Sequence, residues 1–328
     1  MWNVDASNPV GAEYMIMEKI RGISPHGDEW ESLPIGVKLN VIRQVARDLA
    51  VLFSLRFRQA GSLYLPTDGK ADHLRTGPIV SLPFYRAFDG ILEYPGMSPA
   101  TLEALNSLRG PFNTTFEYLA SYLRAKLFKI ENFRDSIFET SDGDVENRIK
   151  NARRIIELGL ELCQSYPGNH PIPSSIGNPS KPFALRLQDF RLTNVLIDAK
   201  TGQINGYIDF EGTTVAPLWL CATVPEWIPD PDGDMADWYG GTPEEQRELW
   251  LVFHTTMDQL DQTLTGGEWR KAFEQGKQFR NFASRLALHI PCWDNLEMEK
   301  YVQDALMWSK EHPGVGMPVD DMTFHSMR

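Results

Sequence analysis

Two carboxylates and an amide lie near one another in the sequence, at Asp189, Asn194 and Asp209. Asn194 directly precedes the β-prone run 195–197, and Asp209 directly follows the β-prone run 204–208. If the two runs pair as a hairpin, Asn194 and Asp209 are cross-strand neighbours about 5 Å apart at its open end. Asp189, one loop upstream, adds a second carboxylate to the same small volume, where the two acids repel unless a cation lies between them.

The residues between the two runs favour such a hairpin. Asp198–Gln203 carries turn-forming side chains, and Gly202 can take a positive φ. Magnesium is the natural cation for the site, because it is a hard ion that takes oxygen ligands and keeps positions open for phosphate oxygens. The sequence therefore predicts Asn194 and Asp209 as magnesium ligands. Asp189, without a metal bond, can orient a substrate hydroxyl and accept its proton.

The pattern D-x-x-x-x-N from Asp189 to Asn194, followed by a hairpin and I-D-F-x-G at 208–212, resembles a known arrangement. It is similar to the catalytic loop and metal-binding segment of the kinase-like aminoglycoside and choline phosphotransferase superfamily. Three more segments resemble fungal members of the aminoglycoside phosphotransferase family: A-E-Y-M-I-M-E-K-I-R-G at 12–22, G-S-L-Y at 61–64 and A-P-L-W-L at 216–220. The likeness covers the chain from Asn8 to about Trp308.

The resemblance implies an α+β, protein-kinase-like fold that consists mainly of the helical C-terminal lobe with its catalytic β-hairpin. The N-terminal lobe is truncated, and residues 1–25 are its remnant together with the hinge strand. Residues 26–311 form the large lobe, in which 185–212 is the catalytic loop and hairpin and 213–311 supplies the acceptor-side helices. Residues 312–328 are expected to be a loosely held tail, because they contain two Pro and two Gly residues.

The activity implied by the resemblance is ATP-dependent transfer of the γ-phosphoryl group to a small-molecule hydroxyl, with Asp189 as the base. Main-chain groups at Glu18, Lys19 and Ile20 would meet the adenine ring, and an N-terminal edge strand is the alternative for this segment. Arg186 and Arg191 flank Asp189, and either could lend positive charge to phosphate oxygens, because a guanidinium forms paired hydrogen bonds with such groups. The alternative for Arg191 is a surface position or an ion pair that positions Asp189.

Two departures from the family pattern bear on this activity. The thirteen residues before Tyr14 contain no Gly-rich loop and no Lys, so the usual clamp on the nucleotide phosphates is missing. Leu187 stands where family members usually carry the His that supports the catalytic loop. Two alternatives to an active enzyme follow: a catalytically silent relative, like a pseudokinase, that binds a small molecule or a protein partner, and an incomplete copy of an active enzyme.

The segment after the hairpin combines acidic and aromatic side chains, which suits a cationic or amino-bearing acceptor. A solvated acidic loop is the competing interpretation. The acidic residues are Glu226, Asp230, Asp232, Asp234 and Asp237, and the aromatic ones are Trp219, Trp227 and Trp238.

The composition of the chain argues against several classes of partner and site. The net charge of −12, without a run of Lys and Arg, argues against nucleic acid. Three scattered cysteines argue against a disulfide framework or a zinc site, and no apolar run approaches the roughly 20 residues that a membrane span needs. The chain is therefore expected to be cytoplasmic, or mitochondrial if upstream sequence is missing.

Helical periodicity and capping signals predict the elements that position the site. The expected helices are 37–57, one that begins near Ser98, 112–133, 144–163, one that begins at Thr242, 269–290 and 296–308. The expected strands or extended segments are 13–18, 62–64 and 79–84.

Overall fold

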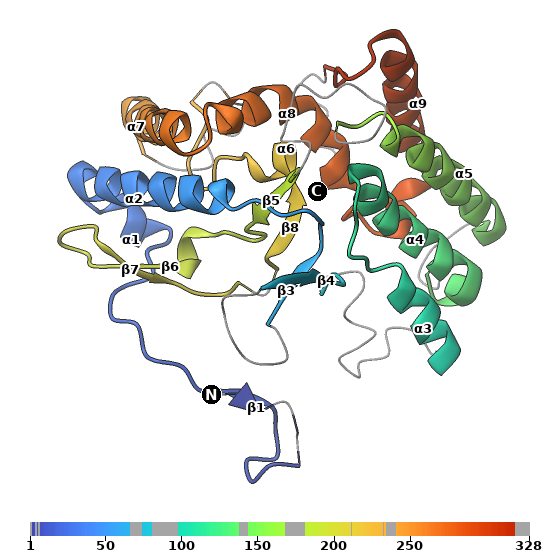
Figure 1. Cartoon of the computed structure of the whole chain (residues 1–328), viewed down its shortest axis with the longest axis horizontal. Coiled ribbons are helices and arrows are strands. Elements are labelled where there is room, and N and C mark those ends of the chain that lie inside the picture. The colour runs from blue at the N-terminus through green and yellow to red at the C-terminus, as the bar shows by residue number, and fades with distance from the viewer. Residues whose placement is uncertain are drawn as a thin grey trace.

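The fold is α+β and mainly helical, with short antiparallel strands set among longer helices (Figure 1). The computed structural model describes residues 2–3, 5, 7–65, 74–80, 98–137, 144–167, 181–210, 212–231, 233 and 241–318. The helices are α1 (Asp28–Glu31), α2 (Ile35–Ser54), α3 (Pro99–Ser107), α4 (Thr115–Ile137), α5 (Val145–Cys163), α6 (Leu218–Cys221), α7 (Pro243–Leu264), α8 (Glu268–Arg285) and α9 (Leu296–Glu311). The strands are β1 (Trp2–Asn3), β2 (Tyr14–Met15), β3 (Ser62–Tyr64), β4 (Arg75–Gly77), β5 (Phe183–Arg186), β6 (Val195–Ile197), β7 (Ile204–Tyr207) and β8 (Thr214–Pro217), and 3₁₀ turns lie at η3 (Leu192–Asn194) and η5 (Ile290–Trp293). The α+β class predicted from the sequence is confirmed.

The helices form one continuous core around the strands. Helix α2 packs along α7, α4 packs on α5, α5 packs on α9, and α6 packs on α8 (Figure 1). Aromatic side chains fill much of this core, and the largest fully buried ones are Trp219, Trp269, Trp293, Tyr118, Phe183, Phe253 and Phe282. Burial of so much apolar area is what holds the helices against the strands.

Helix α2 ends three residues before the predicted end at Phe57. The backbone turns to an extended conformation at Leu55, with φ −73° and ψ 114°. Phe57 N–H then donates to the carbonyl of Phe183, the first residue of β5, at 2.9 Å. The apolar periodicity of the sequence continues to Phe57, so it could not predict that α2 ends at Ser54. The helix ends there because the backbone that follows pairs with a strand far away in the sequence.

The predicted helix caps are present. The Ser98 hydroxyl accepts a hydrogen bond from Thr101 N–H at 3.1 Å, and the Thr242 hydroxyl accepts one from Glu245 N–H at 3.2 Å. The carboxylate of Glu245 contacts the buried ammonium of Lys38 on α2. Glu245 therefore ties α7 to α2 in addition to its place in the first turn of α7.

The antiparallel pair β5–β8 was not predicted from the sequence. Its register joins Phe183 to Pro217 at one end and Arg186 to Thr214 at the other. An isolated bridge from Gly61 to Val215 extends the pairing on the far side of β8. The partners are far apart in the chain and each strand is four residues long, so no local pattern marks them. The loop that carries Asp189 leaves directly from the Arg186 end.

The predicted hairpin is present as β6–β7. Val195 lies opposite Tyr207, and the register shifts once between Leu196 and Ile197. Gly202 in the turn has φ of 69°, and a Cβ atom there would lie 2.4 Å from the carbonyl oxygen of Val37. The hairpin tip therefore packs closely on the first turn of α2, which requires glycine at this position.

The N-terminal segment runs past the hairpin and leads away from the helices to the small β1–β2 pair (Figure 1). Strand β2 is only two residues long, so most of the predicted strand 13–18 is extended without pairing in a sheet. Residues 79–80 are also extended outside a strand, and 81–84 lie outside the described residues. At the other end, Trp308 Nε1–H donates to the Val315 carbonyl at 3.1 Å, so residues 312–318 fold back on α9.

None of the described helices combines the length and the apolar character required to cross a membrane.

Candidate active site

Asp189 and Asp209 have an uncommon backbone conformation. Their φ angles are 58° and 64°, and in the described part of the chain they are the two residues other than glycine with positive φ. This left-handed region costs an L-residue about 1 kcal/mol or more, although Asp tolerates it better than most. Strained backbone of this kind gathers at functional sites, where the surrounding structure fixes a side chain in place. Asp189 and Asp209, the two carboxylates predicted from the sequence to form the site, are thus the two that have this left-handed backbone.

The Asp189 carboxylate forms an ion pair with Arg191 in the loop that follows β5. Arg191 Nε donates to the carboxylate, and Arg191 N–H donates to the Asp189 carbonyl at 2.9 Å. The two side chains are 55% and 71% exposed, respectively. An ion pair this exposed contributes at most about 1 kcal/mol, so a ligand can separate the two groups readily. Arg191 therefore positions Asp189 in this structure and remains able to turn towards an anion.

Asn194 links the Asp189 loop to the hairpin. Its Nδ2 donates to the Asp189 carbonyl at 3.3 Å, and its own carbonyl accepts from Ile208 N–H at 3.0 Å. Asn194 thus lies opposite Ile208, and the expected direct pairing of Asn194 with Asp209 is wrong by one residue. The cause is the register of the hairpin, which pairs Val195 with Tyr207.

Two oxygen-bearing side chains, Asn194 and Asp209, lie at the open end of the hairpin. Asn194 is half-buried and Asp209 is exposed, and within the described residues neither Asn194 Oδ1 nor the Asp209 carboxylate has a hydrogen-bond or ion-pair partner. No three His, Cys, Asp or Glu side chains of the described ranges gather as a metal site. A magnesium ion held here would therefore take two protein ligands and fill its other positions with water and phosphate oxygens.

The predicted adenine-contacting residues lie along the hairpin. Glu18 and Lys19 are exposed, and Ile20 is half-buried against Gly206 of β7, whose missing Cβ would lie 2.7 Å from Ile20 Cδ1. Three residues later, Ile23 forms a two-way backbone bridge with a residue of β6. Among the described residues, no hydrogen bond or ion pair joins residues 18–20 to Asp189.

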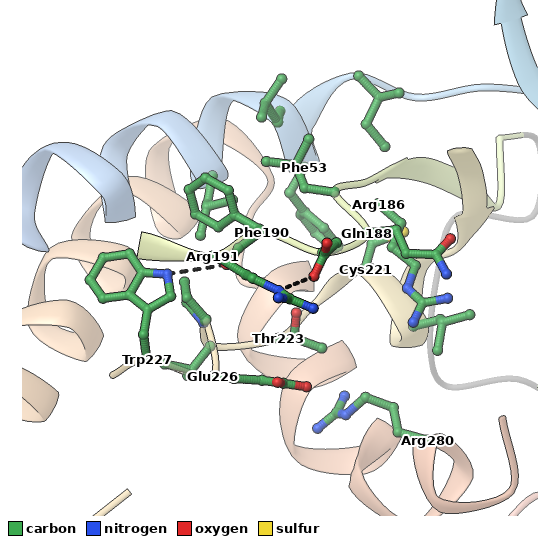
Figure 2. A pocket seen from close by; sticks show the side chains of 18 of the residues that line it. Phe53, Arg186, Gln188, Phe190, Arg191, Cys221, Thr223, Glu226, Trp227 and Arg280 are labelled. Carbon is green, nitrogen blue, oxygen red and sulfur yellow. Dashed lines mark hydrogen bonds and ion pairs between the residues drawn. The ribbon is translucent and has the colours of Figure 1, made fainter. Parts of the chain in front are cut away.

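A cavity of about 660 Å³ opens beside Asp189 (Figure 2). Its walls come from the end of α2, the loop after β5, the segment from α6 to Trp227 and the inner face of α8. Asp189 and Arg191 line it, whereas Asn194 and Asp209 do not. The other charged or hydroxyl-bearing side chains in its wall are Arg186, Thr223, Glu226, Arg280 and Ser284. This volume suits a small organic molecule.

Arg280 is the wall residue that sequence reasoning missed. Its Nη1 donates to the carbonyls of Trp219 and Ala222, and its Nη2 donates to the carbonyl of Phe273, at 2.8 to 3.0 Å. Burial lowers the pKa of Arg280 to about 10, so the group stays charged at neutral pH. In the sequence, Arg280 stands next to Phe279 and close to other apolar residues of α8. The amphipathic pattern of this helix predicts only packing for such residues, so nothing in the sequence marks Arg280 as a wall residue.

Cys221 lines the same cavity but is not a nucleophile at neutral pH. Burial raises the pKa of its thiol to about 12. The thiol donates to the carbonyls of Ala184 and Ala216, both at 3.4 Å, which anchors α6 to the β5–β8 pair. The chemistry of the cavity therefore depends on its oxygen and guanidinium groups.

The acidic and aromatic segment is only partly gathered at the cavity. Glu226 is exposed in the wall, and Trp227 beside it donates its Nε1–H to the Phe190 carbonyl at 3.1 Å (Figure 2). Trp219 is buried in the core. Asp230 is exposed but does not line the cavity. The remaining predicted residues, Asp232, Asp234, Asp237 and Trp238, lie outside the described residues.

A second, largely apolar hollow of about 440 Å³ lies between α2 and the hairpin. Leu187, which replaces the expected His, lines both this hollow and the cavity beside Asp189. Phe210, half exposed directly after Asp209, contributes to the same apolar wall. Leu187 is half-buried and has an apolar side chain, so it cannot form the side-chain hydrogen bonds expected of the His.

Comparison with known proteins adds little about function. No known family profile matches the sequence, and no solved structure matches it significantly. Two curated proteins of Aspergillus fumigatus are similar to it, both described as subtelomeric hrmA-associated cluster proteins, one from strain CEA10 and one from strain Af293. Each is 23% identical over 257 residues, which is 68% of this chain and 47% of the relative. The chain thus spans about half the length of these curated relatives.

Proposed function

We propose that this chain has a protein-kinase-like fold and acts as an aminoglycoside-phosphotransferase-like enzyme. In this proposal it transfers the γ-phosphoryl group of ATP to a hydroxyl of a small molecule. The observation that carries the proposal is the shared left-handed backbone of Asp189 and Asp209, because it singles out the same two carboxylates that the motif selects. Asn194, whose side chain and carbonyl join the Asp189 loop to the hairpin, supports the same arrangement.

Asp189 is the proposed base. An acceptor hydroxyl in the cavity would lie beside its carboxylate, which accepts the proton as the oxygen attacks the γ-phosphorus. The bond from the γ-phosphorus to the bridging oxygen breaks, and ADP leaves. Orientation of the hydroxyl would supply most of the rate acceleration that Asp189 provides, because phosphoryl transfer needs little covalent chemistry from the protein.

Asn194 and Asp209 are the proposed magnesium ligands, and their oxygen donors fit this ion. The ion would neutralise charge on the nucleotide phosphates. The main-chain groups of residues 18–20, which have no backbone partner among the described residues, would meet the adenine ring. Arg191 is close enough to Asp189 to turn from the carboxylate to a phosphate oxygen, since their ion pair is exposed.

Thermal stability in the presence of magnesium and ATP tests the proposal first. A binder gains stability by mass action, so millimolar nucleotide should raise the midpoint of unfolding, and omission of magnesium should reduce the gain. Transfer of radiolabelled γ-phosphate to a panel of small hydroxyl compounds then tests activity. Asp189→Asn should abolish transfer and leave nucleotide binding in place, because Asn also tolerates the left-handed backbone.

Asp198→Asn is the matched control, because Asp198 lies in the turn at the far end of the same hairpin. This variant should transfer phosphate at the parent rate. Equal rates in Asp189→Asn and the parent would remove Asp189 from the mechanism. No stabilisation by magnesium nucleotide at millimolar concentration would reject the proposed function.

One observation favours a second candidate, a binding protein without catalysis. The Asp189 carboxylate is paired with Arg191, and the adjacent support of the loop is the apolar Leu187. In this alternative the cavity still binds a small molecule, and the Asp189–Arg191 pair is a structural element of its wall. Ligand binding without any phosphate transfer, unchanged in Asp189→Asn, would identify this case.

A further inference from the structure

The cavity beside Asp189 has more positive than negative groups in its wall. Three arginines and two carboxylates line it, in a chain whose net charge is −12. One of the arginines, Arg191, is already paired with Asp189. The other two, Arg186 and Arg280, have no carboxylate within 4.0 Å among the described residues. The protein as a whole is negatively charged, so a local excess of positive groups in the cavity wall favours the binding of an anion there.

Arg280 is built into the wall as a fixed donor. Its three hydrogen bonds to the carbonyls of Trp219, Ala222 and Phe273 hold the guanidinium plane in place. Three of its five N–H groups are used in this way. The other two have no acceptor in the described part of the chain. A buried cation satisfied only by carbonyl dipoles gains more from an anion than an exposed one does, because water screens the interaction less.

Arg186 reaches the cavity from the end of β5. It is half-buried, and it has no hydrogen bond or ion pair with any described residue. In the view of Figure 2, the side chains of Arg186 and Arg280 lie to the right of Arg191. Glu226 is exposed at the rim and pairs with neither arginine within the described ranges. Two guanidinium groups that have no carboxylate partner among the described residues therefore line the cavity.

We propose that the molecule bound in this cavity carries an anionic group, a carboxylate or a phosphate, which Arg186 and Arg280 hold while a hydroxyl of the same molecule faces Asp189. The proposal rests on the proposed function for the role of Asp189, but the binding of the anion does not depend on phosphate transfer. It also reverses the expectation of a cationic acceptor, since Glu226 lines the cavity and Asp230, the other described acidic residue of the segment after α6, does not. The hydroxyl and the anionic group would together fix the orientation of the acceptor before transfer.

A matched series of sugars tests this inference without nucleotide. The probes are D-gluconate, glucose 6-phosphate, neutral glucose and cationic glucosamine, which differ in charge and little in size. Isothermal titration and thermal shift should show binding of gluconate, of glucose 6-phosphate or of both, and the stronger of the two distinguishes a carboxylate site from a phosphate site. Equal binding of glucose and both anions, preference for glucosamine, or no binding of either anion at millimolar concentration would overturn the inference.

Arg186→Gln identifies the residue responsible. Because Arg186 has no partner in the described protein, the substitution should leave the unfolding midpoint unchanged and weaken anion binding about tenfold or more. Arg58→Gln is the matched control, since Arg58 is exposed, unpaired in the described structure and outside the cavity. Anion binding that is equally strong in Arg186→Gln and Arg58→Gln would also overturn the inference.

The outcome is separable from that of the proposed function. Anion binding lost in Arg186→Gln, together with no stabilisation by magnesium ATP, supports the anion site and rejects phosphate transfer. Stabilisation by magnesium ATP without anion selectivity supports the nucleotide site and rejects the anion site.

Discussion

Asp189 and Asp209 share a left-handed backbone conformation, one in the loop after β5 and the other at the end of β7. The conformation is costly for a residue with a side chain, and glycine would adopt it without strain. The chain nevertheless carries a carboxylate at each place. Substitutions at these two positions can therefore change the free energy of unfolding and the chemistry of the site in different ways, and each effect can be measured.

Glycine at either position should stabilise the fold relative to alanine. Both substitutions remove the carboxylate, but only glycine relieves the left-handed backbone, so Asp209→Gly should be about 1 kcal/mol more stable than Asp209→Ala. The same order is expected for Asp189→Gly and Asp189→Ala. Urea unfolding of the four variants measures the differences.

Asp198 provides the internal control for this comparison. It is exposed in the hairpin turn and its φ is not positive, so alanine there should be at least as stable as glycine. If glycine were favoured to the same extent at all three positions, the difference would not come from the left-handed backbone.

A second prediction concerns the buried pair that joins α2 to α7. The Lys38 ammonium donates to the Glu31 carbonyl at 3.0 Å and to the Glu245 carboxylate, and the two side chains of the pair are only 3% and 23% exposed. Glu245→Ala would leave the ammonium buried with one acceptor, which should cost about 3 kcal/mol or more. The double variant Lys38→Met, Glu245→Leu should recover most of this loss, because it removes the charge as well.

An exposed pair shows the contrast. Arg153 and Glu131 lie 3.1 Å apart with side chains 38% and 54% exposed, so Glu131→Ala should cost less than about 1 kcal/mol. Chemical denaturation of the single and double variants gives both values and the coupling energy of the buried pair. A loss in Glu245→Ala as small as that in Glu131→Ala would mean that the Lys38 ammonium reaches water.

The elements fixed by local chemistry were predictable from the sequence. Capping by Ser98 and Thr242, the hairpin and the positive φ of Gly202 all follow from side chains close in sequence. The α+β class was expected from the family resemblance. The end of α2 and the pair β5–β8 were not predictable, because each is determined by backbone pairing between segments far apart in the chain, as with the bridge from Phe57 to Phe183.

The candidate site also contains residues that the sequence predicted and residues that it did not. Asp189, Asn194 and Asp209 were found through their spacing, since one loop and one hairpin position all three. Arg280 was not, because α8 brings it to the cavity from far along the chain and its contacts are with carbonyls that no sequence pattern reveals. The position of Asn194 relative to Asp209 also needed the observed register, in which Val195 lies opposite Tyr207.

The last prediction concerns the pH dependence of stability and the buried Lys126 of α4. Its ammonium donates to the Leu288 carbonyl at 2.7 Å. Burial, with a smaller contribution from the charge of Lys129, lowers the pKa of Lys126 to about 7 from an ordinary value of 10.5. Between these two values the unfolded chain binds a proton that the folded chain does not.

The unfolded state therefore holds more protons between pH 7 and pH 10.5, and the free energy of unfolding should rise with pH through this window. The contribution of one such group has a slope of at most about 1.4 kcal/mol per pH unit. Lys126→Met removes the titrating group, so its stability should rise less steeply with pH than that of the parent. Urea unfolding at intervals from pH 7 to pH 9 gives both slopes, and parallel curves for the two proteins would show that Lys126 keeps its charge in the folded state.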